Sequence, residues 1–323
     1  MPLQRTLFDT LCKFNHKKMY KLDGIAKDIR RYFSPDTYRT KRKSGHKKHE
    51  DLFNLSVEEI ITFFDELIQT NHPESKRIAD TSRQLSNLTA ELMSFLSLNG
   101  NPGQNKVLKS FVKKHIAQTD VIVSFNWDTL LDRVLSNQRK KTNWDRRWGY
   151  GYEVGKRFKC GRKNNDGKPG KYPKLFKLHG SVNWVSEKLD QDEKETYSIT
   201  PDWGELREYE KVVMMPPKMV KREIFDPVAI YQPIWNEAEK RMIKCKKIVF
   251  VGYSFPPADF AVSNMLRRVI SSIKTEKRKS PTIVIVDPNV EELAKRFEAS
   301  FNVKIDSDNR YLSLKSYLSG DRV

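Results

Sequence analysis

The sequence contains little cysteine and little glycine, and it has no long apolar segment. Its three cysteines, Cys12, Cys160 and Cys245, stand far apart, which excludes a disulfide framework and a zinc module of four cysteines. No run reaches the roughly 18 apolar residues of a membrane helix, and the N-terminal residues lack a signal-peptide pattern. With 14 glycines, loops that cradle phosphates are expected to be few. We therefore expect a cytoplasmic protein with no membrane partner.

Acidic residues are outnumbered by basic ones, 41 against 60, which gives a formal net charge of +19. Residues 39–49 and 274–279 form the densest basic runs, and such runs can follow a phosphate backbone. Neither run is accompanied by a helix-turn-helix, zinc-finger or RNP pattern, so solvated loops are the simpler interpretation. The charge is thus a weak sign of nucleic acid and a somewhat better sign of an acidic ligand or partner.

The N-terminal part is predicted to be mainly helical. Apolar residues recur there at spacings of three and four over residues 7–14, 57–68, 79–98 and 106–117. Ser56 and Glu59 resemble a capping box, and the NGNPG segment at 99–103 is expected to end the third helix. We interpret residues 1–118 as a helical subdomain of the same fold.

The pattern changes after residue 118 to short apolar runs, of which the first is rich in β-branched residues. They occupy residues 121–125, 174–178, 211–215, 247–251 and 282–286, and segments of helical length separate the last of them. Strands that alternate with helices are typical of a parallel sheet with crossover helices. The sequence therefore predicts an α/β fold, a Rossmann-like doubly wound parallel sheet, over residues 119–323. We expect a loop insertion at about 136–172.

Small polar clusters follow four of these predicted strands. They lie at residues 126–128, 179–184, 252–256 and 287–289. Each cluster alone could be ordinary turn chemistry. Ligands of such sheets, however, bind at the carboxyl ends of the strands, so the four clusters together predict a binding site there.

Taken in order, these segments resemble the sirtuin-like NAD-hydrolase domains of bacterial anti-phage defence systems. The resemblance rests on SFNWDTLLD (124–132), KLHGSVNW (177–184), MMPP (214–217), IWNEAEKRMIKCKKIVFVGYSFPPAD (234–259) and VIVDPN (284–289). The fourth of these segments ends in the loop GYSFPPAD (252–259). It implies an NAD+ glycohydrolase, which cleaves NAD to nicotinamide and ADP-ribose. The implied biological role is depletion of NAD during phage infection.

The resemblance also implies roles for individual residues. His179 would be the general base, since imidazole titrates near neutral pH. Asn126 would orient the ribose hydroxyls and the attacking water, and Asp128 would accept from the nicotinamide carboxamide. The remaining residues expected to contact NAD are Ser124, Gly252, Tyr253, Ser254, Asp287 and Asn289.

Two features of the family are missing from this sequence. The family opens with a strand and a Gly-Ala-Gly-x-Ser loop that holds the pyrophosphate, whereas this chain begins MPLQRTLFDTL. Either the natural chain starts further upstream, or the pyrophosphate half of the site is absent. The two cysteine pairs of the protein deacetylases are also missing, so no zinc is expected and a deacylase is the least favoured alternative.

Other interpretations of the same residues stay open. His179 alone could be a structural histidine, and Asn126 and Asp128 could simply cap the helix that follows. Ser254 is not the nucleophile of a Ser hydrolase, because Pro256 stands where that motif needs glycine. The chain could be a catalytically impaired scaffold or a nucleic-acid-associated accessory protein. Expected partners are a second copy of the chain and a nucleic-acid-linked protein such as a helicase or an Argonaute-like protein.

Overall fold

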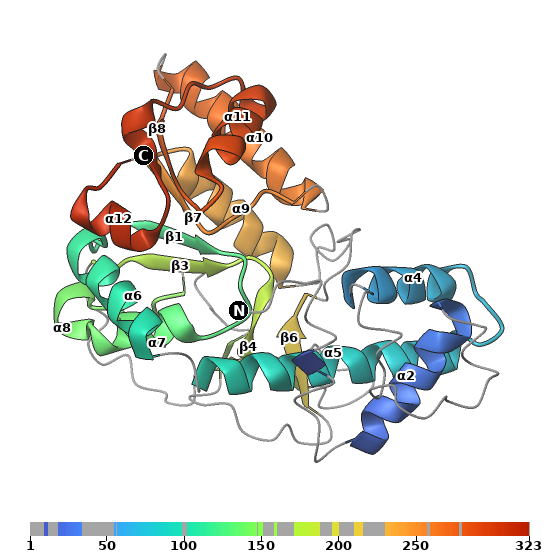
Figure 1. Cartoon of the computed structure of the whole chain (residues 1–323). Coiled ribbons are helices and arrows are strands. Elements are labelled where there is room, and N and C mark those ends of the chain that lie inside the picture. The colour runs from blue at the N-terminus through green and yellow to red at the C-terminus, as the bar shows by residue number, and fades with distance from the viewer. Residues whose placement is uncertain are drawn as a thin grey trace.

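The chain folds as a mixed α/β protein with a helical extension on one side (Figure 1). The computed structural model describes residues 10–11, 19–33, 55, 57–98, 102–146, 148–150, 158–159, 171–187, 196–199, 210–215, 230–256, 259–277 and 280–322. The basic run at 39–49 and the capping residue Ser56 lie outside these residues. Among the helices of the described segments, none combines the length and the apolarity needed to cross a membrane.

Two parallel sheets form the centre of the α/β part. One pairs β1 (Val121–Ser124) with β3 (Lys174–Lys177), and the other has the order β7-β8-β9. The bounds of the second sheet are β7 (Lys247–Val251), β8 (Thr282–Val286) and β9 (Arg310–Tyr311). Parallel strands buried on both faces read as continuous apolar runs, which is why the sequence reveals all but the two-residue β9. The doubly wound arrangement stays a prediction, because backbone pairing joins these strands in two separate sheets.

Helices and both parallel sheets share one hydrophobic core. It contains Trp144, Phe176, Trp235, Phe250 and Phe297, all less than a tenth exposed. The helices of this core are α6 (Pro102–His115), α7 (Leu130–Asn137), α9 (Tyr231–Met242), α10 (Phe260–Lys277) and α11 (Val290–Phe301). Outside it lie the short helix α8 (Arg139–Thr142), a 3-10 turn at Ser307–Asn309 and α12 (Leu314–Ser319), which packs against Val284, Val286 and Tyr311.

The structure contains a third sheet, and one of the strands predicted for the parallel sheet belongs to it. β6 (Glu210–Met214) pairs antiparallel with β4 (Gly180–Glu187), and the order is β2-β5-β4-β6, with β2 (Phe158–Lys159) and β5 (Thr196–Ile199). The run at 211–215 is therefore a strand, but it does not belong to the parallel sheet. The first residues of β4 were expected to be a polar cluster after a strand. Small and polar residues have a low strand propensity, so their types do not indicate the extended backbone that β4 adopts.

The helical extension consists of α2 (Met19–Phe33), α4 (Val57–Gln69) and α5 (Ser75–Leu98). The helices predicted at 57–68 and 79–98 are confirmed, and of the one predicted at 7–14 the two described residues, 10 and 11, are helical. The helix predicted at 106–117 begins earlier, at Pro102. Proline fits the first turn of a helix, where its missing N–H is not needed.

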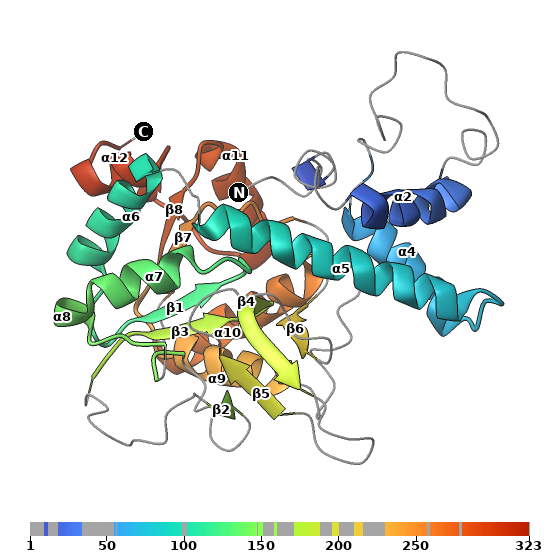
Figure 2. The same ribbon diagram turned by 90° about the horizontal axis from the view of Figure 1, so that it is seen from below.

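Strand β6 separates two hydrophobic cores. Val213 and Met215 belong to the core of the parallel sheets, whereas Val212 and Met214 belong to a second core with α2, α4 and α5. Successive side chains of a strand point to opposite faces, so one strand serves both cores. Figure 2 shows α5 extending from the α/β part to α2 and α4. The division of the chain at residue 118 stays a prediction, and α6 packs with the first core.

The segment 136–172 is only partly the loop that was expected. It contains the end of α7, the short helix α8 and strand β2, while residues 151–157 and 160–170 lie outside the described residues. Trp144 and Tyr150 are buried in the core, and their rings lie edge to face at 5.5 Å. These aromatic side chains anchor the described part of the segment to the sheet.

Candidate functional site

The ends of β1, β3 and β7 meet in a cluster of aromatic rings. The ring centroid of Phe125, just after β1, lies 5.5 Å from that of His179, just after β3. It lies 4.6 Å from the ring of Tyr253, which follows β7. Phe125 therefore joins the two parallel sheets at their carboxyl ends, which is where sheets of this kind bind ligands.

His179 is buried beside a carboxylate. Its side chain is 8% exposed, and its Nε2 lies 3.8 Å from Oδ1 of Asp259. The hydroxyl of Tyr253 donates a hydrogen bond of 3.0 Å to Oδ2 of the same carboxylate. Burial, and then the charge of Asp259, raise the pKa of Tyr253, so the phenol stays a neutral donor. Asp259 is thus positioned to orient the imidazole and to stabilise its protonated form.

Backbone geometry explains the glycine that follows His179. Gly180 has a φ of +76°, and a Cβ there would lie 2.2 Å from the carbonyl oxygen of Val213. The backbone N–H of Met215 donates to the carbonyl of His179 at 2.8 Å. Only glycine lets β4 and β6 approach so closely at this point, and that approach fixes the backbone of the histidine.

Asn126 lies beside the histidine segment with its side chain exposed. Its backbone N–H donates to Oγ of Ser124 at 3.3 Å. The next carbonyl, that of Trp127, accepts from Ser181 Oγ at 3.2 Å and from the N–H of Val182 at 3.0 Å. These bonds tie the loop after β1 to the start of β4, so the two predicted catalytic residues stand on loops that are bonded to each other.

Asp128 is buried and caps the following helix. Its Oδ1 accepts from the backbone N–H of Leu130 at 2.8 Å, as the capping interpretation expected. Because this oxygen is engaged and the side chain is 7% exposed, the predicted bond from Asp128 to a ligand has little room. The bond to Leu130 is a structural role, and the ligand role of Asp128 stays a prediction.

A buried polar network lies under this loop. Lys177, 1% exposed, donates from Nζ to the carbonyl of Asp128, and its Nζ lies 3.7 Å from Oδ2 of Asp132. The hydroxyl of Tyr150 donates to Asp132, and Asn183 Nδ2 donates to that hydroxyl at 3.2 Å. Burial and the charge of Asp132 raise the pKa of Tyr150 well above its ordinary value. The network fixes the loop that carries Asn126 to β3 and β4.

The predicted cofactor-binding residues after β7 and β8 form a neighbouring pair of turns. Gly252 has a φ of +61°, and its N–H donates to the carbonyl of Val286 at 2.9 Å. Asp287 Oδ1 accepts from the N–H of Asn289 at 2.9 Å, so part of that carboxylate stabilises its own turn. Ser254 and Asn289 are exposed. The structure thus places these residues at the carboxyl ends of β7 and β8, and the ring of Tyr253 connects them through Phe125 to the sheet that carries His179.

The loop after β7 is held in an unusual conformation. Phe255 has a φ of +49°, which is rare for an aromatic residue, and its ring packs 5.0 Å from those of Phe250 and Phe297. Arg296 donates to the carbonyls of Ser254 and Phe255 at 3.1 and 3.3 Å. Such backbone strain persists where the surroundings hold it, and it is commonest in functional loops.

Three residues of this region were not anticipated as site residues. Phe125 joins the sheets, Asp259 faces the histidine, and Arg296 holds the loop after β7. Asp259 stands only five residues after Ser254, inside the recognised segment 252–259. Its acidic side chain could have been noted there, but its proximity to His179 depends on how β3 and β7 are placed in space.

Within the described residues, no three His, Cys, Asp or Glu side chains are grouped as a metal site would require.

Comparison with known families adds one finding. Residues 120–305 match the family model described as a SIR2-like domain, which is more than half of the chain and includes every element of the candidate site. No curated protein matches the chain.

Proposed function

Because the chain belongs to the SIR2-like domain family, we propose that it hydrolyses NAD to nicotinamide and ADP-ribose. SIR2-like domains are often NAD-dependent enzymes, and the finer assignment to hydrolysis is our proposal. The observation that carries it is the buried His179–Asp259 pair, which lies beside the loop of Asn126 at the carboxyl edge of the sheets.

The reaction breaks one bond and forms one. The bond between nicotinamide and the ribose C1′ breaks, and its electron pair neutralises the positive charge of the pyridinium ring. A water oxygen then bonds to C1′, and the water loses one proton. Since nicotinamide departs as a neutral pyridine, the protein needs no acid for departure; it needs to orient the nucleotide and to activate the water.

Three side chains supply these roles in the proposal. His179 accepts the proton of the water, and Asp259 stabilises the imidazolium that results. Asn126 offers an amide that can both donate and accept, which suits a water and the ribose hydroxyls. Its exposed position beside a buried base matches that task.

The turns after β7 and β8 are proposed to hold the adenosine half of NAD. Gly252 lets the nucleotide approach the backbone closely, and Ser254 and Asn289 provide exposed polar groups. Ser124 and Asp128 are proposed to act indirectly, since both bond to the loop of Asn126 or to the helix that follows it. Tyr253 acts through Asp259.

The test is release of nicotinamide from NAD by the purified chain, followed by chromatography. We expect Asn126→Ala and His179→Ala to reduce the rate by at least the roughly 100- to 10,000-fold that a general base contributes. Asn289→Ala is expected to raise KM with little change in kcat, because it contacts the part of the substrate that does not react.

Two matched variants control for general damage. Asn137→Ala and His115→Ala remove the same side-chain types from exposed positions on α7 and α6, away from the carboxyl ends of the strands, and both should keep full activity. If the chain binds NAD but releases nicotinamide at the same rate in every variant, the site assignment is wrong. If it neither binds nor cleaves NAD, the scaffold alternative replaces the enzyme.

The biological role and the partners of the chain are further proposals, more specific than the family assignment. We propose that NAD depletion serves defence against phage infection in the cytoplasm, with a second copy of the chain or a nucleic-acid-linked protein such as a helicase or an Argonaute-like protein as partner. Expression of the chain during infection, with cellular NAD measured beside His179→Ala, tests this role. Unchanged NAD levels in infected cells would exclude it.

A further inference from the structure

A second surface lies at the opposite end of the strands from the candidate site. Lys247 begins β7, whereas Val251 ends it beside Tyr253. At about 3.3 Å per residue, the two ends of this strand are on the order of 13 Å apart. A ligand at the beginning of the strand therefore need not obstruct the proposed active site.

Exposed lysines from three elements surround His115 on this surface. Lys114 belongs to α6, Lys141 to α8 and Lys247 to β7. Desolvation lowers the pKa of His115 most, and the charges of these same three lysines lower it further. Gln118 Nε2 donates to the carbonyl of Lys141 at 2.9 Å, which fixes α8 to the end of α6. We call Lys114, Lys141, Lys247 and His115 the basic edge.

The basic edge has almost no acidic counterpart. Residues 102–119 and 240–247 contain no Asp or Glu, and they include the further exposed lysines Lys113 and Lys246. The acidic residues that flank these segments have other partners: Asp120 accepts from the backbone N–H of Ala117 at 2.8 Å, Asp145 pairs with Arg139 at 3.4 Å, and Glu239 pairs with Arg268 at 2.6 Å. Over the part of the chain that the structure describes, no carboxylate lies within ion-pair distance of Lys114, Lys141 or Lys247. The positive charges are therefore available to an external anion.

Aromatic rings lie among these lysines. The ring of His115 stacks on that of Phe111 at 5.7 Å and lies 4.8 Å from that of Tyr317 in α12. Lys247 Nζ donates to the hydroxyl of Tyr317 at 3.4 Å. The contacts hold α6, α12 and β7 together, so the lysines stand on a preformed surface and little order must be gained on binding.

We propose that the basic edge binds the phosphodiester backbone of a nucleic acid. Lysines contributed by three separate elements present several charges along a surface, which suits a polymer of phosphates better than a single anion. A membrane surface would also need exposed apolar side chains. Among the described residues the large exposed ones are Phe95, Val251, Phe260 and Leu312, and none belongs to the basic edge.

The experiment measures binding of a fluorescein-labelled 20-nucleotide DNA, single-stranded or duplex, by anisotropy at several salt concentrations. The variant Lys114→Gln/Lys141→Gln/Lys247→Gln removes the three charges. The matched control Lys27→Gln/Lys76→Gln/Lys295→Gln removes the same net charge from exposed lysines of α2, α5 and α11. Circular dichroism and the melting temperature verify that both variants fold.

We expect the wild type and the control to bind, with an affinity that falls steeply with salt. Each phosphate contact contributes about 0.7 to the slope of log K against log salt for a single strand. The basic-edge variant should therefore lose roughly 2 from this slope, together with at least tenfold in affinity at low salt.

Three outcomes would overturn the proposal. The first is absence of nucleic-acid binding by the wild type, and the second is equal loss in both variants, which would reduce the effect to net charge. The third is binding to vesicles of anionic lipid but not to nucleic acid. Release of nicotinamide is measured on the same samples, so a failure of the proposed function is seen separately.

Discussion

At the residue scale, the pairing of Asp259 with His179 has a direct consequence for catalysis. The carboxylate lies 3.8 Å from the imidazole Nε2 and is itself held by the hydroxyl of Tyr253. A buried carboxylate in this position fixes the orientation of a base and stabilises the cation that it becomes. Asp259 is thus a positioning residue in the proposed reaction rather than a group that touches the substrate.

Asp259→Asn is expected to lower kcat for nicotinamide release and to leave KM for NAD nearly unchanged. The variant keeps the shape of the side chain but removes its charge, so the loss can reach the roughly 100- to 10,000-fold contribution of a general base. Steady-state kinetics over a range of pH measures both constants. A rise in KM at constant kcat would show instead that Asp259 supports binding.

Two glycines of the chain are expected to respond oppositely to alanine. At Gly180, with its φ of +76° and with Val213 O only 2.2 Å from a new Cβ, Gly180→Ala should lower the free energy of unfolding by more than about 1 kcal/mol. At Gly24, inside α2 with open space around it, Gly24→Ala should raise it by about 0.5–1 kcal/mol. Urea denaturation followed by circular dichroism measures both, and equal signs would contradict the explanation.

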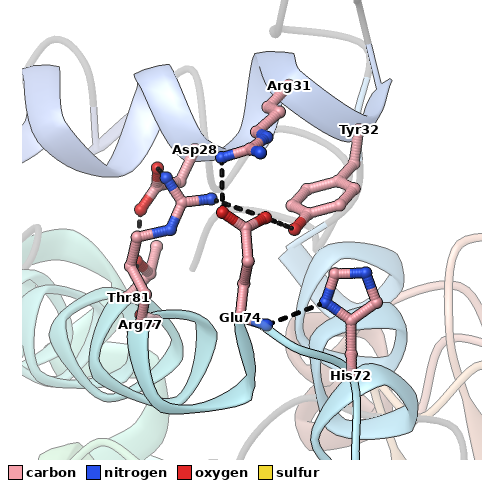
Figure 3. A network of polar contacts seen from close by, with 7 residues as sticks. All are labelled: Asp28, Arg31, Tyr32, His72, Glu74, Arg77 and Thr81. Carbon is pink, nitrogen blue, oxygen red and sulfur yellow. Dashed lines mark hydrogen bonds and ion pairs between the residues drawn. The ribbon is translucent and has the colours of Figure 1, made fainter.

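At the element scale, a polar network docks α2 onto the start of α5 (Figure 3). Arg31 and Tyr32 of α2 donate to the carboxylate of Glu74 at 2.6 and 2.8 Å. Arg77 of α5 reaches back to Asp28 of α2 at 3.1 Å. Glu74 thus receives bonds from one helix at the position just before another begins.

The network makes the stability of this docking dependent on pH. The hydrogen bond from Tyr32 is the largest cause of a lowered pKa at Glu74, and Arg77 and Arg31 lower it further. Since this pKa is lower in the folded than in the unfolded chain, the stabilisation is present above the ordinary value of 4.5 and is lost as the pH falls through the folded value.

Glu74→Gln should therefore lower the melting temperature at pH 7, and the difference from wild type should shrink as the pH falls below about 4.5. Calorimetry at several pH values measures this difference. Glu66→Gln, which replaces an exposed carboxylate on α4, serves as the control and should follow the wild type throughout. A difference between Glu74→Gln and wild type that stays constant with pH would contradict the assignment.

At the scale of the whole molecule, the two hydrophobic cores are coupled through β4 and β6. Val182 of β4 packs with the helical core, and Trp184 of the same strand packs with the core of the parallel sheets. The helical core also contacts Trp127, next to Asn126. Loss of the helical core is therefore expected to disturb the loop that carries the proposed catalytic asparagine.

Phe64→Ala tests this coupling. Phe64 of α4 is fully buried in the helical core, and its truncation should cost about 3–5 kcal/mol. Trp144, Trp184 and Trp235 are buried in the core of the parallel sheets, whereas Trp127 packs against the helical core. In a Trp127→Phe background the fluorescence therefore reports mainly the α/β part, whereas circular dichroism reports all helices. If the cores unfold together, both midpoints shift equally. A fluorescence midpoint that stays at the wild-type value would show that the helical part unfolds alone.

Local pattern was sufficient to locate the longer strands of the two parallel sheets. The apolar runs at 121–125, 247–251 and 282–286 correspond to β1, β7 and β8, because a buried parallel strand needs apolar side chains on both faces. The same argument placed 211–215 in the wrong sheet. A strand that separates two cores is also apolar on both faces, so composition cannot distinguish β6 from a parallel strand.

The positions of the predicted site residues follow from chain order, but their contacts do not. Polar residues after strands belong at the carboxyl edge, and Asn126, His179 and Gly252 are found there. Asp128 was expected to serve a ligand and is largely engaged in capping α7. Either use suits an aspartate after a strand, and only the burial of the side chain separates them.

The sequence by itself determined the alternation of elements, the excess of positive charge and the family, since these depend on residue type and order along the chain. Only the tertiary structure decided that Asp259 faces His179, that β6 divides two cores, and that lysines of α6, α8 and β7 share one edge. Each of these is a proximity between residues far apart in sequence. Such proximities are set by how whole elements pack, which no local pattern of residues encodes.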